Sequence, residues 1–155
     1  MDLGIIIYSQ TGNTRYVAGK LKEKLEAEGH RAEIEEIKIS GSTPAQAGKF
    51  EITDAPAPDG YDAVIFGSPV QAFSLNPVMK AYLAQLPSLE NKKVACFVTK
   101  QLPLVQTGGT GAVARMKKEC ESRGAAVLGT EIVVWSKSKR DRSVNKCVEE
   151  LSRLF

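Results

Sequence analysis

Six consecutive residues suited to binding an anion follow the first apolar run of the chain. The run is Leu3–Tyr8, and the residues after it are Ser9, Gln10, Thr11, Gly12, Asn13 and Thr14. A helical pattern begins at once, and the amide groups and positive dipole end of a helix start attract anions. Hydroxyl groups add donors, and glycine lets the backbone approach closely. A plain helix cap needs only one such residue, so the turn, which has no lysine, predicts a site for a phosphate monoester.

Apolar residues alternate between strand-like runs and helix-like stripes along the chain. Strands are expected at residues 3–8, 32–37, 63–66, 94–98 and 125–135. Helices are expected at residues 17–25, 78–86, 113–120 and 144–154. Such alternation predicts right-handed βαβ units and a parallel sheet covered by helices on both faces. Ligands of these sheets bind beyond the carboxyl ends of the strands, so the segments after the strands are the ones to search.

Residues 38–60 interrupt this alternation. The segment is rich in glycine, proline, serine and alanine and has no strong apolar period. We expect a long surface connection here, with at most a turn or two of helix.

Segments at three strand ends resemble flavodoxins. The turn Ser9–Thr14 is similar to the flavodoxin phosphate-binding loop, and Phe66–Ala72 and Phe97–Thr99 are similar to the segments after the third and fourth strands. The resemblance covers nearly the whole chain. It implies one flavodoxin-like domain over residues 1–155, an α/β three-layer sandwich whose five-stranded parallel sheet has the order 2-1-3-4-5 with helices on both faces.

The resemblance also implies flavin mononucleotide (FMN) as the cofactor. Its phosphate would lie on the first segment, and its ring would lie between Ser68–Asn76 and Thr99–Gly109. The predicted cofactor-binding residues are Ser9, Gln10, Thr11, Gly12, Asn13, Thr14, Ser68, Pro69, Val70, Gln71, Ala72, Phe73, Thr99, Lys100, Gln101 and Leu102. We predict no catalytic residue and no metal ligand.

The predicted flavin segments differ from those of flavodoxins in their aromatic and glycine residues. Phe73 is the one aromatic residue that could stack on the ring, whereas flavodoxins commonly place it between a tryptophan and a tyrosine. Flavodoxins also often use a glycine peptide that flips when the flavin gains one electron. No glycine lies between Ser68 and Asn76, and a positive φ at Gln71 or Ala72 would be costly.

The charge around these segments is also unusual for a flavodoxin, in which acidic residues surround the flavin. No acidic residue lies between Asp62 and Glu90 or between Glu90 and Glu119, and these stretches, which contain both flavin segments, also contain Lys80, Lys92, Lys93 and Lys100. A cation within several ångströms of the ring would stabilise the fully reduced anion by about 1–3 kcal/mol.

Three functions remain open. The resemblance implies an FMN-binding flavoprotein that mediates electron transfer to a redox partner protein or a small-molecule electron acceptor. The missing glycine and the lysines favour instead a small FMN-dependent NAD(P)H:quinone-type two-electron reductase. The third function is that of a flavodoxin-like binding module without FMN, and the complete phosphate loop argues against it.

Composition and charge argue against a membrane-inserted protein and against a nucleic-acid partner. No apolar run approaches the ~20 residues that cross a bilayer, and Leu3–Tyr8 is too short for a signal peptide, so we expect no membrane insertion. A net charge of +3 is too small to predict a nucleic-acid partner. Cys96, Cys120 and Cys147 are widely spaced and odd in number, which predicts buried, reduced thiols in a cytoplasmic protein.

A basic run, Lys137-Ser138-Lys139-Arg140-Asp141-Arg142, follows the fifth expected strand. It should therefore lie at the same edge of the sheet as the predicted cofactor. It is either a solvated turn that opens the last helix or a docking patch, for an acidic partner or for a phosphate of a nicotinamide cofactor.

Overall fold

The computed structural model of the protein describes residues 1–41, 50–101 and 108–155. Five parallel strands form its central sheet in the order β2-β1-β5-β7-β8. Their bounds are β1 (Asp2–Ile7), β2 (Arg31–Glu36), β5 (Ala63–Gln71), β7 (Lys93–Lys100) and β8 (Ala126–Val134). This order confirms the predicted 2-1-3-4-5 arrangement. A sixth strand, β6 (Ser74–Leu75), pairs antiparallel with the end of β5.

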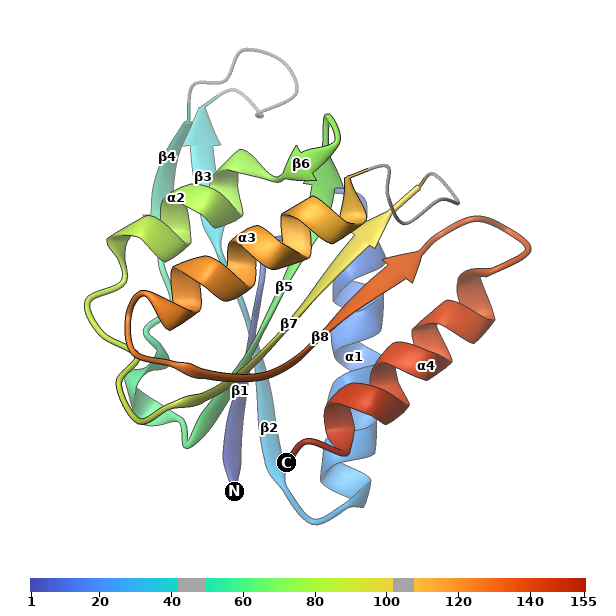
Figure 1. Ribbon diagram of the computed structural model, residues 1–155, viewed down its shortest axis with the longest axis horizontal. Coiled ribbons are helices and arrows are strands. Elements are labelled where there is room, and N and C mark those ends of the chain that lie inside the picture. Colours follow the sequence, from blue (N-terminus) through green and yellow to red (C-terminus); the bar gives the residue numbers. More distant parts are fainter. Residues whose placement is uncertain (42–49, 102–107) are drawn as a thin grey trace.

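Helices cover both faces of the sheet (Figure 1). One face carries α1 (Asn13–Ala27) and α4 (Arg140–Ser152), and the other carries α2 (Pro77–Gln85) and α3 (Gly109–Glu121). Each interface has its own apolar core, which includes Leu21, Phe97 and Leu151 on the first face and Phe66, Met79 and Met116 on the second. Because the central strands are buried on both sides, their sequences are continuously apolar. The result is the predicted three-layer sandwich.

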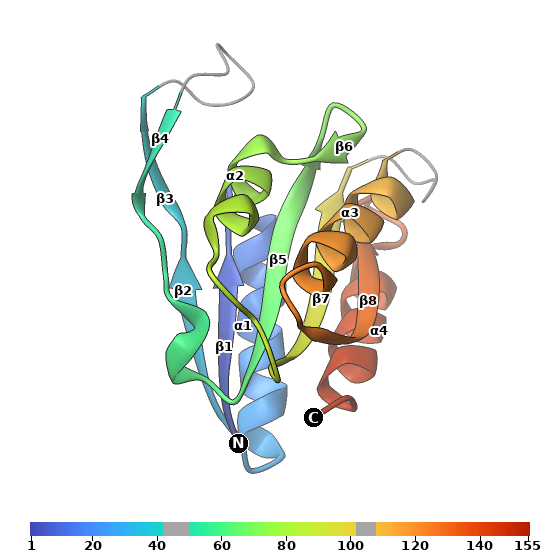
Figure 2. The same cartoon turned by 60° about the vertical axis from the view of Figure 1, so that its left-hand side comes forward.

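Two strands that pair as a hairpin lie within segment 38–60, where we expected a long surface connection with at most a turn or two of helix. The prediction missed these strands, whereas the short 3-10 helix Pro58–Gly60 agrees with the expected turn. β3 (Lys38–Gly41) and β4 (Phe50–Asp54) pair antiparallel, with Ile39 opposite Ile52. Their apolar residues alternate with exposed ones at the period of a strand, and Ile39, Phe50 and Ile52 pack against the core below α2 and α3. The hairpin continues upward from β2 and reaches the end of the molecule that carries β6 (Figures 1 and 2).

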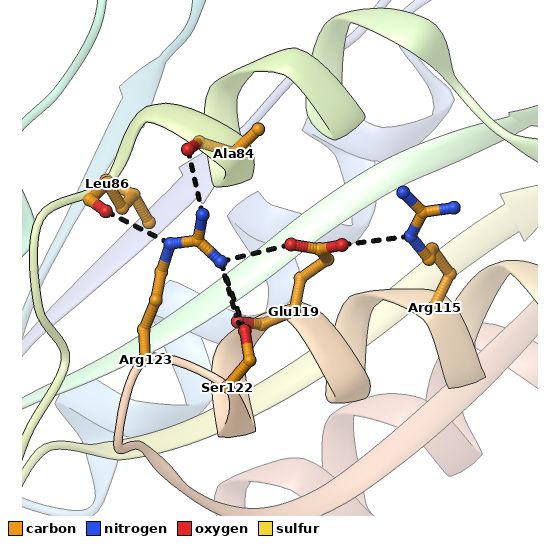
Figure 3. A network of polar contacts seen from close by, with 6 residues as sticks. All are labelled: Ala84, Leu86, Arg115, Glu119, Ser122 and Arg123. Atoms are coloured by element: carbon orange, nitrogen blue, oxygen red, sulfur yellow. Dashed lines mark hydrogen bonds and ion pairs between the residues drawn. The ribbon is translucent and has the colours of Figure 1, made fainter.

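The guanidinium of Arg123 joins the ends of α2 and α3 (Figure 3). It donates to the backbone oxygens of Ala84 at 2.8 Å and Leu86 at 3.0 Å, and to the Glu119 carboxylate at 3.0 Å. Glu119 also accepts from Arg115 at 3.1 Å, and this bond is the main reason why the pKa of its carboxyl is lowered. The contacts hold together the helices of one face.

Burial of the cysteines agrees with the prediction. Cys96, Cys120 and Cys147 are buried and free. Burial raises the pKa of the Cys147 thiol, so the thiol stays protonated.

Candidate functional site

The start of α1 has no capping side chain. Gly12 occupies the cap position with φ +94°, and the first turn has no acidic residue. Ser9 Oγ lies 3.4 Å from the Arg15 amide nitrogen, a long contact, and the amide groups of Asn13 and Thr14 have no acceptor among the described residues. Helix amide groups without partners, together with the helix dipole, make this turn a candidate anion site.

Thr14 points inward and contacts the end of β7. Its hydroxyl oxygen lies 3.0 Å from that of Thr99, and both side chains are buried. The bond links the first and third predicted segments. Thr14 therefore contributes a structural contact as well as its amide group, whereas the sequence suggested a hydroxyl directed at the phosphate.

The three segments meet at a cleft of about 140 Å³ at the carboxyl ends of β1, β5 and β7. The residues that line it were all predicted from the sequence: Gln10, Thr11, Asn13, Pro69, Val70, Thr99, Lys100 and Gln101. The other predicted site residues that the structure describes do not line the cleft, namely Ser9, Gly12, Thr14, Ser68, Gln71, Ala72 and Phe73. The prediction for Leu102 lies outside the described residues.

The end of β5 is held by short polar contacts. The Ser68 hydroxyl is buried and donates to the backbone oxygen of Pro69 at 3.2 Å. Gln71 accepts a hydrogen bond from the side chain of Asn76 at 2.8 Å. Asn76 in turn caps α2, because it accepts from the Val78 amide group at 2.8 Å. These contacts order the wall of the cleft that Pro69 and Val70 form.

Two non-glycine residues with positive φ form the turn between β5 and β6. Ala72 has φ +49° and Phe73 has φ +63°, the left-handed values that a two-residue hairpin turn requires. We expected such an angle at Ala72 to be costly, and the hairpin adopts it nonetheless. Gly108 lies against Phe73 so closely that a Cβ there would stand 2.6 Å from Phe73 Cα. The Phe73 ring itself is 66% exposed.

Lys100 is the one cationic residue among the described residues that line the cleft. It is 4% exposed, and its aliphatic chain passes close to Gly109 at the start of α3. Burial, with the charge of Lys139 as a second cause, lowers the pKa of its ammonium group. A positive charge at the end of β7 favours anions in the cleft.

The acidic residues that could offset this charge lie elsewhere. Asp59 belongs to the short 3-10 helix Pro58–Gly60, which leads into the amino end of β5. Glu51 and Asp54 are exposed on β4. Glu36 at the end of β2 is paired with Arg15, whose Nη2 lies 2.6 Å from its Oε1. The described wall of the cleft thus keeps its excess of positive charge.

A larger cavity of about 310 Å³ lies at the opposite end of the sheet. It is lined by Asp2, Arg31, Glu33, Glu35 and Tyr61, among others. Its carboxylates repel an anion, and the Tyr61 hydroxyl already donates to Glu35 at 2.5 Å. Parallel α/β sheets bind ligands at the carboxyl ends of their strands, so the smaller cleft is the candidate site.

Sequence reasoning missed an aromatic pair beside the cleft. Trp135 follows β8, and its ring meets that of Tyr16 edge to face at 5.6 Å. The Trp135 amide group donates to the backbone oxygen of Lys100 at 2.7 Å. The available signal was the position of Trp135 at the end of the fifth expected strand, whereas nothing in the sequence marked Tyr16 beyond its place in a helical pattern.

Two other site types find no support in the parts of the chain that the structure describes. None of the described helices has the length and apolar character to cross a membrane. Histidine, cysteine and carboxylate side chains there form no group of three suited to a metal ion.

The sheet order, the uncapped first helix and the cleft define a doubly wound α/β protein with a candidate anion site at the carboxyl edge of its sheet. The chain belongs to the flavodoxin family, because the family model for the flavodoxin domain matches residues 5–128. No curated protein matches its sequence.

Solved structures share the fold over nearly the full length. Oxidised flavodoxin 1 from Bacillus cereus has a TM-score of 0.70 at 20% identity, with 99% of this chain and 96% of that chain covered. Two-electron reduced flavodoxin from Megasphaera elsdenii has a TM-score of 0.65 at 20% identity, with coverage of 96% and 98%. The Trp repressor binding protein from Bacillus subtilis has a TM-score of 0.70 at 14% identity, with both chains fully covered.

Proposed function

We propose that the cleft binds FMN and that the protein mediates electron transfer. The observation that carries this proposal is the start of α1, where, within residues 1–41, 50–101 and 108–155, the amide groups of Asn13 and Thr14 have no acceptor and no side chain caps the helix. A helix start left open in this way suits a phosphate, which accepts several hydrogen bonds at once. Membership of the flavodoxin family supports FMN as the source of that phosphate.

The residues of the cleft fit FMN in their chemistry. Thr11 and Asn13 would bind the phosphate with the amide groups of the turn, and Gly12 leaves room for its approach. Pro69 and Val70 offer an apolar wall, and Lys100 offers a positive charge at the other side. The cleft of about 140 Å³ admits only part of the cofactor, so the ring would lie against its rim. FMN, when bound, takes up and releases electrons singly or in pairs.

A second function, two-electron reduction of a small acceptor with NAD(P)H, is favoured by one observation. Lys100 lines the cleft, and the acidic residues nearest to it along the neighbouring elements are exposed or paired. A cation there stabilises a fully reduced, anionic flavin and so disfavours storage of a single electron. Photoreduction of the FMN-loaded protein in steps distinguishes the two functions. Accumulation of a form reduced by one electron supports the electron carrier, and direct passage to the fully reduced form supports the reductase.

The phosphate site is tested with two ligands that share the flavin ring. FMN and riboflavin, which lacks the phosphate, are titrated into the cofactor-free protein while flavin fluorescence is followed. We expect FMN to bind more tightly than riboflavin. Replacement of both Thr11 and Asn13 by alanine should weaken FMN binding about 100-fold or more, because bonds to a charged group are each worth ~1.5–3 kcal/mol.

The variant Thr53→Ala is the matched control, since Thr53 is exposed on β4 and lies outside the cleft. It should leave both affinities unchanged. Equal affinity for FMN and riboflavin would contradict the phosphate site, and no binding of either flavin would leave the protein a flavodoxin-like binding module.

A further inference from the structure

Seven exposed or half-buried side chains beside the cleft form a basic–aromatic stripe. They come from α1, from the end of β8 and from the start of α4. The stripe consists of Tyr16, Lys20, Trp135, Lys137, Lys139, Arg140 and Arg142.

The aromatic rings of the stripe are held in place by its cations. Tyr16, which is 49% exposed, meets Trp135 edge to face. The Arg140 guanidinium lies 5.7 Å from the centre of the Trp135 ring, and Lys20 Nζ lies 5.8 Å from that of Tyr16. Each ring thus has a cation of the same chain over it, which leaves it poorly placed to stack on a nucleic-acid base.

Stability does not explain the cations at the start of α4. Lys139 occupies the cap position without a side-chain cap, and Lys137, Arg140 and Arg142 are exposed around it. Positive charges at a helix start oppose the helix dipole. Asp141 is the one acidic residue between Trp135 and Val148 in the sequence, and its side chain is 91% exposed.

The stripe adjoins the cleft. Trp135 donates to the backbone of Lys100, a residue that lines the cleft, at 2.7 Å. The charge of Lys139 is close enough to Lys100 to contribute to the lowered pKa of its ammonium group. A molecule docked on the stripe would therefore lie beside the cleft.

Charge is distributed unevenly along residues 26–155. Residues 26–62 contain nine acidic and three basic residues, whereas residues 63–155 contain seven acidic and fourteen basic ones. The first segment includes the outer strand β2 and the β3–β4 hairpin, at the opposite edge of the sheet from β8. Such a polarity orients the stripe toward a negatively charged partner during encounter.

We propose that the basic–aromatic stripe docks an acidic surface of a partner protein. Clustered lysine and arginine side chains attract carboxylates over long distances, and tryptophan and arginine are the residues that most often anchor protein interfaces. The role of the partner as an electron donor or acceptor rests on the proposed function, but the docking itself does not.

Trp135 is the only tryptophan of the chain, so its fluorescence reports on the stripe directly. The probe is a synthetic peptide with six glutamates and no tryptophan, and its counterpart has six lysines. At low salt the glutamate peptide should change the Trp135 emission in a saturable manner, and the lysine peptide should not. The affinity should fall steeply as salt is added. Absence of saturable binding at low salt would overturn the proposal.

Two triple variants with the same loss of charge separate the stripe from net charge. Replacement of Lys137, Lys139 and Arg142 by serine should weaken peptide binding about tenfold or more. The control, with serine at Lys93, Lys117 and Lys118, removes three exposed cations from other surfaces and should change it less than about twofold. Equal weakening in both variants would overturn the proposal. Thermal unfolding of both variants verifies that they fold.

The alternative occupant, a nucleotide phosphate, is tested with adenosine 2′,5′-bisphosphate. If it binds the stripe more tightly than the glutamate peptide, the partner assigned here is wrong. FMN titrations of the same proteins separate this inference from the proposed function. A stripe variant that loses peptide binding but keeps its FMN affinity shows that the stripe, and not the cleft, binds the peptide. A wild-type protein that binds the peptide but not FMN contradicts the proposed function and leaves the docking proposal intact.

Discussion

The hydroxyl oxygens of Thr14 and Thr99 lie 3.0 Å apart beneath the cleft, where they join the first turn of α1 to the end of β7. The two residues are separated by 85 positions in the sequence, and both side chains are buried. A buried hydroxyl pair satisfies both groups only while both are present. The contact therefore couples the Ser9–Thr14 turn to the strand that carries Lys100.

A double-mutant cycle at this pair should show strong coupling. Thr14→Val and Thr99→Val should each lower the free energy of unfolding by about 1–3 kcal/mol, because each leaves one buried hydroxyl without a partner. The double variant should cost less than the sum of the two. Urea unfolding measures all four proteins, and additive losses would show that the two hydroxyls act independently.

Substitution of Gly108 should destabilise the protein through the β5–β6 turn. Gly108 has φ +101°, and a Cβ there would stand 2.6 Å from Phe73 Cα and 2.8 Å from its carbonyl oxygen. Gly108→Ala should therefore lower the free energy of unfolding by about 2 kcal/mol or more. Gly111→Ala is the control in α3, where a Cβ meets no atom within 4 Å, and it should stabilise the helix by up to about 1 kcal/mol. A neutral Gly108→Ala in thermal unfolding would contradict this packing.

Removal of the Lys139 charge should raise the pKa of Lys100. Burial and Lys139 both lower that pKa, so Lys139→Ser removes one cause, whereas Lys117→Ser removes a cation that has no part in the shift. NMR titration of the Lys100 side chain measures both variants. An unchanged pKa in Lys139→Ser would show that burial alone acts.

The same shift determines how Lys100 affects stability with pH. Between its lowered pKa and the ordinary value of 10.5, the unfolded chain binds more protons than the folded one. Stability therefore rises with pH across this window, and the difference between the wild-type protein and Lys100→Met in urea unfolding should shrink there.

Arg123 should contribute more to stability than its neighbour Arg115. Arg123→Ala removes hydrogen bonds to the backbone oxygens of Ala84 and Leu86 at the end of α2 and should cost about 1–3 kcal/mol. Arg115 pairs with Glu119 at the surface, so Arg115→Ala should cost less than about 1 kcal/mol in the same denaturation experiment. Equal effects would mean that the bonds to α2 add nothing.

Acid should weaken this network in a defined direction. The pKa of Glu119 is lowered, first by its bond to Arg115, so its stabilising contribution is complete above the ordinary value of 4.5. The contribution is lost as the pH falls through the lowered pKa. The loss of stability between neutral and acidic pH should be smaller in Arg115→Ala than in the wild-type protein.

Local sequence patterns were sufficient for the alternation of strands and helices and for the three segments that meet at the cleft, whereas the sheet order came from the resemblance to flavodoxins. The apolar runs and helical stripes repeat at their own periods, and the turn after β1 carries its donors within six residues. The β3–β4 hairpin was missed because each of its strands contributes few apolar residues, and these became meaningful only when Ile39 and Ile52 paired.

What the sequence by itself determined is therefore the alternation of strands and helices and the chemistry of the residues at the strand ends, since both depend on neighbours along the chain. Only the tertiary structure decided that Thr14 bonds Thr99, that Tyr16 packs on Trp135 and that Lys139 lies near Lys100. These contacts join residues far apart in the sequence. Their geometry depends on strand register and on how the helices pack across the sheet, which no local pattern specifies.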